Sequence, residues 1–581
     1  MRLSKLLLFV GLLVLALLSV SQDVLRPGPD GPSGKVDDWV YSERTMADRT
    51  TGALPSPTAS APSSMAQEAG AARLGYAVGG AKDTENFREN IANGYLPLPS
   101  DLTYEGLFYD YYFDTGEQTP CEHLFCPSYS HAVSRDPLSG EPEGYLTVGL
   151  NSGLTEADFQ RKTLNLVIVL DISGSMSSAF DQYYYDRFGQ RQEVEPAEDA
   201  EVSKMALAAE SVVALMEHLN ADDRFGMVLF NEQAHLAKPL SRVGDTDMSA
   251  IRDHVLELGA GGSTNMSAGM EMGTGLYDEI GPVDPAASEN RIIFLTDAMP
   301  NRGATDDDDL LGLARRNAER GIHATFIGIG VDFNTELIET IGTIRGANYH
   351  SVHSAQQFRE RMDEGFEYMV TPLVFNLELT LEASGYRIAQ VYASPDADEA
   401  TGRLMTVNTL FPSKTDHGET RGGVVLLKLE RLVSSDGSAS DQRLVLRVSY
   451  EGRNGQSNAV ETAISLDEHA PDYFANSGIR KAVLLARYAD LLQNWLVDEH
   501  RRQEADGPIE PSINTEIGIH PPHLEPWLGR WERQSVSLLV SDHYRAMIRD
   551  FRDHMQTEIA RINDATLQQE MDILSSLIDL Q

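Results

Sequence analysis

The chain has 581 residues, of which 41% are hydrophobic, and 88 acidic residues against 47 basic ones give a formal net charge of −41. A chain of this length exceeds a single ordinary hydrophobic core, so we expect two or more folded units. So negative a charge repels nucleic-acid phosphates and anionic lipid, which excludes both as main partners.

The first 21 residues have the pattern of an export signal. Arg2 and Lys5 precede an apolar run over residues 6–18, and small residues precede a cut after Ser21. The run is shorter than the roughly 18 to 20 residues that a membrane span needs, which favours a signal peptide over an uncleaved anchor. We therefore expect an exported protein, periplasmic or at the cell surface, with a membrane tether through the N-terminus as the alternative.

The next two segments differ in composition. Residues 22–80 are rich in Pro, Ser, Ala and Gly, which predicts a disordered linker. An N-terminal flanking region follows over residues 84–160 and contains both cysteines of the chain, Cys121 and Cys126. In an exported protein so close a pair indicates a disulfide rather than a zinc site, which would need further ligands.

Residues 161–371 alternate between two kinds of periodicity. Short apolar runs at residues 164–170, 225–230, 291–296 and 323–329 predict buried strands, and the segments between them repeat apolar residues at helical spacing. This order predicts an α/β, Rossmann-like fold with a mostly parallel sheet and helices on both faces. Ligands of such sheets bind at the carboxyl ends of the strands.

The rest of the chain has simpler patterns. Apolar and polar residues alternate over residues 372–470, which predicts a small, separate β-rich domain. Residues 475–581 repeat apolar residues at helical spacing, so we expect a C-terminal helical region with a structural role.

Oxygen-bearing side chains stand at three loops of the α/β region. The first strand ends in Asp171-Ile-Ser173-Gly-Ser175, Thr264 ends a Gly-Gly-Ser-Thr sequence before a helix, and Asp297 follows a later strand. In a doubly wound sheet these loops can converge on one crevice. Two carboxylates and three hydroxyls suit a hard cation and leave room for water or one more ligand.

These three motifs together resemble the metal-ion-dependent adhesion site of von Willebrand factor type A (VWA) domains, over about residues 160–370. The resemblance implies a metal site formed by Asp171, Ser173, Ser175, Thr264 and Asp297. It also implies that the ion is Mg²⁺, with Ca²⁺ or Mn²⁺ as alternatives, and that a partner protein supplies an acidic residue to it. Ala298 departs from the Gly of many members, which affects the shape of the loop and no ligand. The flanking regions resemble, more vaguely, those of exported bacterial VWA proteins.

The function we expect is a divalent-cation-dependent protein-binding or assembly module, and not an enzyme. One alternative is an exported metal-dependent hydrolase of phosphate esters. Phosphotransferases of the haloacid dehalogenase type need a second carboxylate two residues after the first. Ser173 stands at that position here, which favours binding over this alternative. Another alternative is a scaffold whose metal site is vestigial.

A polar insertion separates the first metal loop from the next helix. It lies between Met176 and Lys204 and contains Tyr183, Tyr184 and Tyr185. Tyrosine clusters provide rigid amphipathic contact area in recognition surfaces, so we expect these tyrosines to help select the partner. The alternative is a local packing insertion.

Overall fold

The computed structural model describes most of the chain outside its N-terminal segment and several connections. The described residues are 34–42, 73–78, 84–92, 94–116, 123–155, 159, 161–178, 183–185, 191–193, 202–281, 284, 287–297, 307–329, 341–352, 355–363, 365–394, 397–413, 415–416, 419–432, 443–505 and 537–579. The predicted signal at residues 1–21 lies outside them. No helix among the described residues is both long enough and apolar enough to cross a membrane.

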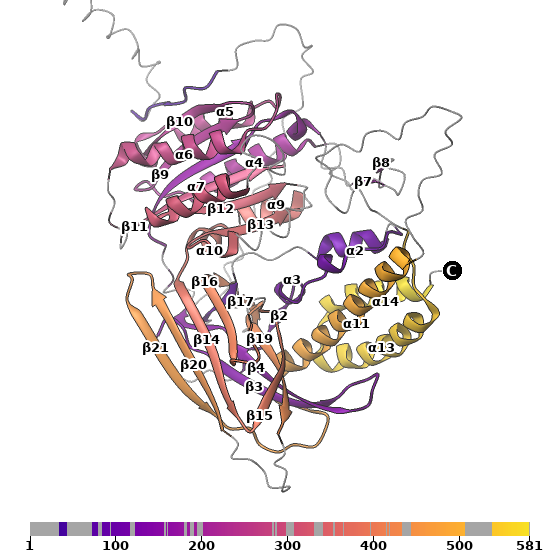
Figure 1. Ribbon diagram of the computed structural model, residues 1–581. Helices are drawn as coiled ribbons and strands as arrows, with labels where there is room; N and C mark the ends of the chain where they lie inside the picture. Colours follow the sequence, from indigo (N-terminus) through magenta and orange to yellow (C-terminus); the bar gives the residue numbers. More distant parts are fainter. Residues whose placement is uncertain are drawn as a thin grey trace, which may run out of the picture.

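A six-stranded sheet forms the centre of the α/β unit (Figure 1). Its order is β10-β9-β6-β11-β12-β13, in which neighbouring strands from β9 to β13 run parallel and β10 pairs antiparallel with β9 at the edge. The strands are β6 (Thr163–Asp171), β9 (Arg224–Phe230), β10 (Ala234–Arg242), β11 (Ser288–Thr296), β12 (Ile322–Ile329) and β13 (Asn348–Val352). The predicted mostly parallel sheet is confirmed.

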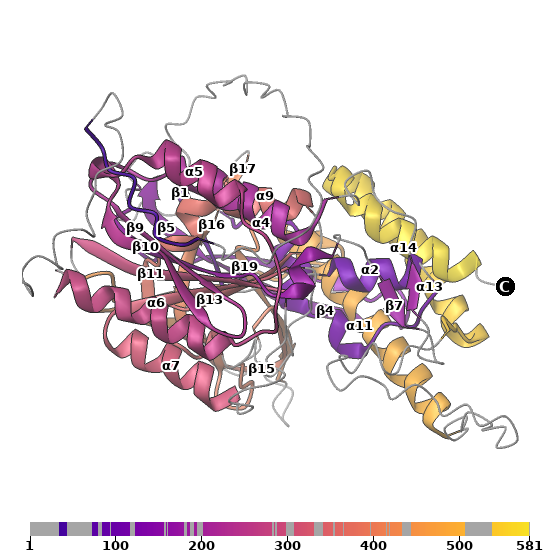
Figure 2. The same cartoon turned by 90° about the horizontal axis from the view of Figure 1, so that it is seen from above.

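Helices cover both faces of this sheet (Figure 2). One face packs against α4 (Lys204–Met216), α5 (Met248–Leu256), α9 (Ala355–Met362) and α10 (Phe366–Val370), and the other against α6 (Met266–Ile280) and α7 (Asp307–Glu319). Gly273 lets α6 approach closely, because a Cβ there would lie 2.7 Å from the side chain of Val169 in β6. Burial on both faces explains why β6, β9, β11 and β12 are apolar almost throughout.

Two segments of the predicted linker are ordered, so the linker prediction for residues 22–80 is wrong there. Residues 34–42 lie along β10, where the N–H of Val40 donates to the carbonyl of Ala237 at 2.9 Å. Residues 73–78 form β1 (Arg73–Val78), which pairs with two other strands. The Pro, Ser, Ala and Gly content of residues 22–80 indicated disorder. Composition does not show that a few side chains within such a segment pack against another part of the fold.

Most of the remaining strands form two further large sheets, and each contains strands from before and after the α/β unit. Their orders are β21-β20-β14-β16-β1-β5 and β15-β19-β4-β3-β22, and side chains from both sheets share one apolar core. The strands before the α/β unit are β1, β3 (Ser128–Arg135), β4 (Pro142–Gly149) and β5 (Asn151–Thr155). Those after it are β14 (Val374–Ser384), β15 (Tyr386–Tyr392), β16 (Arg403–Ser413), β19 (Val424–Arg431), β20 (Arg443–Gly452), β21 (Ser457–Ile464) and β22 (Tyr473–Phe474). The predicted β-rich region at residues 372–470 is confirmed, but it is not a separate domain, because the α/β unit is inserted into one β-sandwich.

A helical unit completes the fold beside the sandwich (Figure 1). Its members come from both ends of the described chain: α2 (Glu85–Ala92), α3 (Tyr104–Tyr109), α11 (Ser477–Ala505), α13 (Asp542–Ile562) and α14 (Gln568–Asp579). Within the predicted helical region over residues 475–581, α13 ends at Asn563, which caps it in the left-handed conformation with φ 61°. The predicted C-terminal helices thus share a core with the N-terminal flank.

Candidate metal site at the carboxyl edge of the sheet

Asp171 ends β6 at the carboxyl edge of the sheet and is fully buried. Its Oδ1 accepts a hydrogen bond from the N–H of Ser173 at 2.8 Å, and its Oδ2 accepts one from the hydroxyl of Thr296 at 2.6 Å. Burial raises the pKa of Asp171 to about 6. The two hydrogen bonds act to lower this pKa, but burial outweighs them. A carboxylate held this far from water is stabilised by a cation beside it.

The turn after β6 joins Asp171 to the second carboxylate. Ser173 and Ser175 flank the start of a short 3-10 helix, and their Oγ atoms lie 3.1 Å apart. The hydroxyl of Ser175 donates to Oδ1 of Asp297 at 2.7 Å. Asp297 follows β11, the strand that pairs directly with β6. Hydrogen bonds therefore link four of the five predicted ligands into one cluster.

The loop that carries Thr264 is fastened to the same turn. Gly174 donates its N–H to the carbonyl of Gly262 at 2.9 Å, and Gly261 donates to the carbonyl of Ile172 at 2.7 Å. Gly262 has φ +92°, and a Cβ there would lie 2.1 Å from the carboxylate of Glu232, so the loop needs glycine. Thr264 is half-buried just before α6, on the loop that these bonds hold beside the serines.

The structure adds three residues to the site that the sequence analysis missed. Lys204, the first residue of α4, places its Nζ 3.1 Å from Oδ2 of Asp297. Thr296 holds Asp171, and the exposed Glu232 accepts from the N–H of Ser263 at 3.1 Å. Thr296 could have been found, since it precedes Asp297 in the motif. Lys204 and Glu232 had no comparable signal, because only the fold brings α4 and the loop after β9 to this edge.

The donor set fits a small divalent cation. Adjacent ligand oxygens of an octahedral Mg²⁺ with bonds of about 2.1 Å lie roughly 3 Å apart, which matches the distance between the two serine hydroxyls. Among the residues described, no cluster of three or more His, Cys, Asp or Glu could hold a metal. The five predicted ligands are instead two carboxylates and three hydroxyls, which is the composition expected for Mg²⁺ rather than zinc.

Two further predictions concern residues that are only partly described. Tyr183, Tyr184 and Tyr185 form strand β7 (Tyr183–Tyr185), which pairs with β8 (Arg191–Glu193), but their side chains lie outside the described part of the chain. Cys126 is disulfide-bonded, while Cys121 lies outside the described residues. The role of the tyrosines and the Cys121–Cys126 pairing stay predictions.

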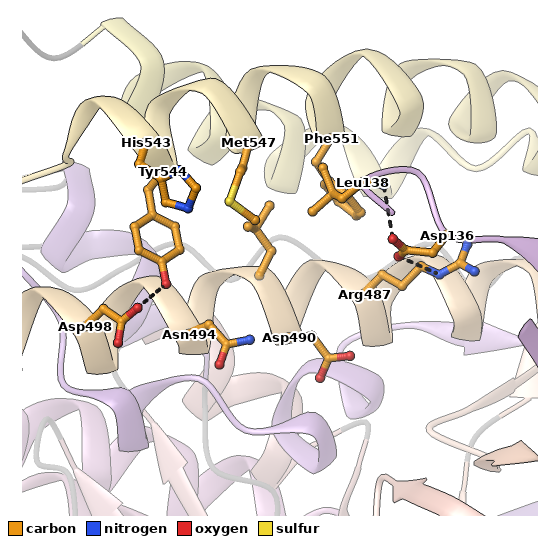
Figure 3. Close-up of a pocket in the computed structure, with 11 residues that line it drawn as sticks. Asp136, Leu138, Arg487, Asp490, Asn494, Asp498, His543, Tyr544, Met547 and Phe551 are labelled. Carbon is orange, nitrogen blue, oxygen red and sulfur yellow. Dashed lines mark hydrogen bonds and ion pairs between the residues drawn. The ribbon is translucent and has the colours of Figure 1, made fainter. Parts of the chain in front are cut away.

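A pocket of about 350 Å³ lies elsewhere, between α11, α13 and the turn after β3 (Figure 3). Its charged side chains already have partners: Asp498 accepts from the hydroxyl of Tyr544 at 2.5 Å, and Arg487 lies 3.8 Å from Asp136. These pairs join the two helices and the turn, so we assign them to the packing of the helical unit.

Comparisons with known proteins identify the family of the α/β unit. The family model described as von Willebrand factor type A domain matches residues 165–364. Inter-alpha-trypsin inhibitor heavy chain H1 of Mesocricetus auratus is 24% identical over 219 residues, which are 37% of this chain and 21% of that protein. The uncharacterized protein YfbK of Escherichia coli is 21% identical over 38% of this chain and 33% of its own length.

These relatives are matched over only a fifth to a third of their lengths. A solved structure, von Willebrand factor type A from Catenulispora acidiphila, is 18% identical with a TM-score of 0.38, and the match covers 68% of this chain and 84% of that one. The family model spans the sheet from β6 to β13 and all three loops of the site. Residues 165–364 of this chain are a von Willebrand factor type A domain.

Proposed function

We propose that this protein is an exported binding or assembly module whose VWA domain holds a divalent cation and uses it to bind a partner protein. The observation that supports this most is the cluster in which Asp171, Ser173, Ser175 and Asp297 bring their oxygens together at the carboxyl edge of the sheet. Domains of this family commonly mediate protein–protein interactions.

The side chains divide the work of holding the ion. Asp171 and Asp297 supply negative charge, directly or through water, and Ser173, Ser175 and Thr264 supply neutral oxygens. We assign the site to Mg²⁺ first, with Ca²⁺ or Mn²⁺ as alternatives. When bound, the ion supplies an electrophilic centre that an acidic residue of the partner can reach. This role is binding and not catalysis.

The polar insertion follows the first metal loop directly in sequence, and this supports a role in selecting the partner. Ser178 lies directly after the metal turn, and its carbonyl accepts a hydrogen bond from the N–H of Lys204 at 3.0 Å, which joins the two ends of the insertion. We assign partner selection to Tyr183, Tyr184 and Tyr185. Deleting the insertion should weaken partner binding and leave cation affinity unchanged.

Export is the further part of the proposal. It rests on the basic start, the short apolar run and the small residues before a cut after Ser21. In this setting the protein acts in the periplasm or at the cell surface, and an uncleaved segment would keep it at a membrane.

The first test is calorimetric titration of the full chain with Mg²⁺, Ca²⁺ and Mn²⁺. Asp171→Asn keeps an oxygen for the N–H of Ser173 but removes the charge, so cation affinity should fall at least about tenfold. Asp222→Ala is the matched control, because Asp222 is an exposed carboxylate of the same domain paired with Arg242. Equal cation binding by the native chain and by Asp171→Asn would refute the site. Thermal melts in chelator establish that each variant is folded.

A further inference from the structure

Lys204 is an unusual neighbour for a cation site. Its ammonium group lies 3.1 Å from Oδ2 of Asp297, and the two side chains are 8% and 0% exposed. The other oxygen of Asp297 accepts the hydroxyl of Ser175. A positive charge of the protein itself therefore occupies one side of a carboxylate that we assign to the metal site.

The helix geometry fixes Lys204 in this place. Lys204 begins α4, and Ser203 caps that helix by accepting from the N–H of Ala206 at 3.1 Å. The N–H of Lys204 donates to Ser178, at the end of the metal turn. Backbone and side chain thus both tie Lys204 to the site and hold its ammonium group beside Asp297.

We propose that Lys204 is a built-in counter-charge that weakens the binding of the cation alone and strengthens the binding of an anionic partner group to the loaded site. This inference rests on the function proposed above and deepens it.

The effect of Lys204 follows from the charges at the site. Two carboxylates and one ammonium leave one net negative charge, so a divalent cation is attracted less than it would be by Asp171 and Asp297 alone. Once the cation is bound, the site has one net positive charge instead of none. Glu232 lies on the rim, but its side chain is exposed and solvent screens its charge. Because Lys204 and Asp297 are shielded from water, a unit charge here outweighs one at the surface.

The loaded site is consequently suited to a carboxylate ligand. A neutral loaded site would hold a carboxylate by coordination only, whereas this one also attracts it by net charge. The ligand class that we infer is an acidic side chain or a free carboxylate, and the partner would be acidic where it meets the domain.

The experiment uses the full chain and compares Lys204→Gln, which removes the charge, with Lys204→Arg, which keeps it. Mg²⁺ affinity is measured by calorimetry. Acetate binding to the loaded site is measured with Mn²⁺ through water-proton relaxation, which falls when acetate displaces metal-bound water. Lys204→Gln should bind Mg²⁺ about tenfold more tightly and acetate about tenfold more weakly than the native chain. Lys204→Arg should stay within about threefold of the native chain on both scales.

Each other outcome is decisive. Unchanged or weaker Mg²⁺ binding by Lys204→Gln, with a native thermal melt, would overturn the inference and leave Lys204 a packing residue, while the proposed metal site stands. Binding by Lys204→Gln but not by the native chain would support the inference strongly. If neither the native chain nor Lys204→Gln binds Mg²⁺ or Mn²⁺ at millimolar concentration, the proposed function fails, and the inference fails with it. Should Lys204→Gln not fold, Lys204→Met replaces it, since it fills similar volume without charge.

Discussion

Glu289, near the start of β11, links two charged neighbours at the edge of the VWA sheet opposite the metal site. Its Oε1 lies 2.7 Å from Nδ1 of His323 and 2.9 Å from Nη2 of the fully buried Arg291. The guanidinium of Arg291 also lies 5.6 Å from the ring centroid of Phe411, a residue of the sandwich. Burial acts to raise the pKa of Glu289, but His323 and Arg291 outweigh it and lower the pKa to about 2.

This shift makes the stability of the protein sensitive to acid. The pKa of Glu289 is lower in the folded chain than its ordinary value of 4.5, so its contribution is fully present above about pH 4.5 and is lost as the pH falls toward 2. Urea unfolding of the native chain and of Glu289→Gln between pH 2.5 and 6 tests this. The variant should be less stable at pH 6, by about 3 kcal/mol because Arg291 loses its charged partner, and the difference should shrink in acid. A constant difference across this range would contradict the assignment.

Residues 34–42 form a short segment that contributes to the packing of the VWA domain. It runs along β10 and places Asp38 3.1 Å from Nζ of Lys238, a lysine with no exposed side-chain surface. The ring of Trp39 stacks on His254 of α5 with centroids 5.3 Å apart. Burial lowers the pKa of Lys238, and Asp38 opposes this effect. A short segment far from the sheet in sequence thus supplies the carboxylate of a buried ion pair.

Removing this carboxylate should destabilise the VWA domain. Asp38→Ala leaves the Lys238 ammonium buried with only hydroxyl and carbonyl acceptors among the described residues, so we expect a loss of about 3 kcal/mol in the free energy of unfolding. Asp37→Ala is the control, because Asp37 pairs with a half-exposed His254 and should change stability by less than about 1 kcal/mol. Chemical denaturation of both variants decides, and Asp38→Ala/Lys238→Met should recover part of the loss. Equal stability of the two single variants would show that the segment is not part of the domain.

At the scale of the whole molecule, the VWA domain is an insertion whose two ends are fastened together. Arg161, just before β6, pairs with Glu367 in α10 at 2.9 Å and with Asp223 at 2.5 Å. The bidentate pair of Arg345 with Glu451, at 2.6 and 3.1 Å, joins the domain to the sandwich. In the large sheets the N-terminal flank pairs with strands after residue 371, since β1 pairs with β16, β4 with β19 and β3 with β22.

This topology predicts the result of truncation. A chain that ends at residue 371 keeps the VWA sheet but leaves β3 and β4 as an isolated hairpin, which is at best marginally stable in water. In hydrogen exchange, the amides of residues 128–149 should lose their protection, while those of residues 163–171 keep it. The full chain measured in parallel provides the reference. Protection of residues 128–149 in the truncated chain would mean that the flank folds without its partners.

The sequence by itself determined the features that depend on local pattern. The alternation of short apolar runs with helical spacing specified the α/β order, and the motifs placed Asp171, Ser173 and Ser175 on one strand end and Asp297 on another. Adjacent parallel strands end at the same edge, so this pattern also predicted that these residues meet. The alternation of apolar and polar residues likewise predicted strands within residues 372–470.

Only the tertiary structure decided which distant segments share a surface. It placed Lys204 on Asp297 and Asp38 on Lys238, and it joined the two flanks into one sandwich. Lys204 and Asp297 are 93 positions apart in sequence, and Asp38 and Lys238 are 200 apart. A periodic pattern shows only that a side chain will be buried, not what it will meet. For the same reason the charge balance of the metal site became visible only in the folded chain.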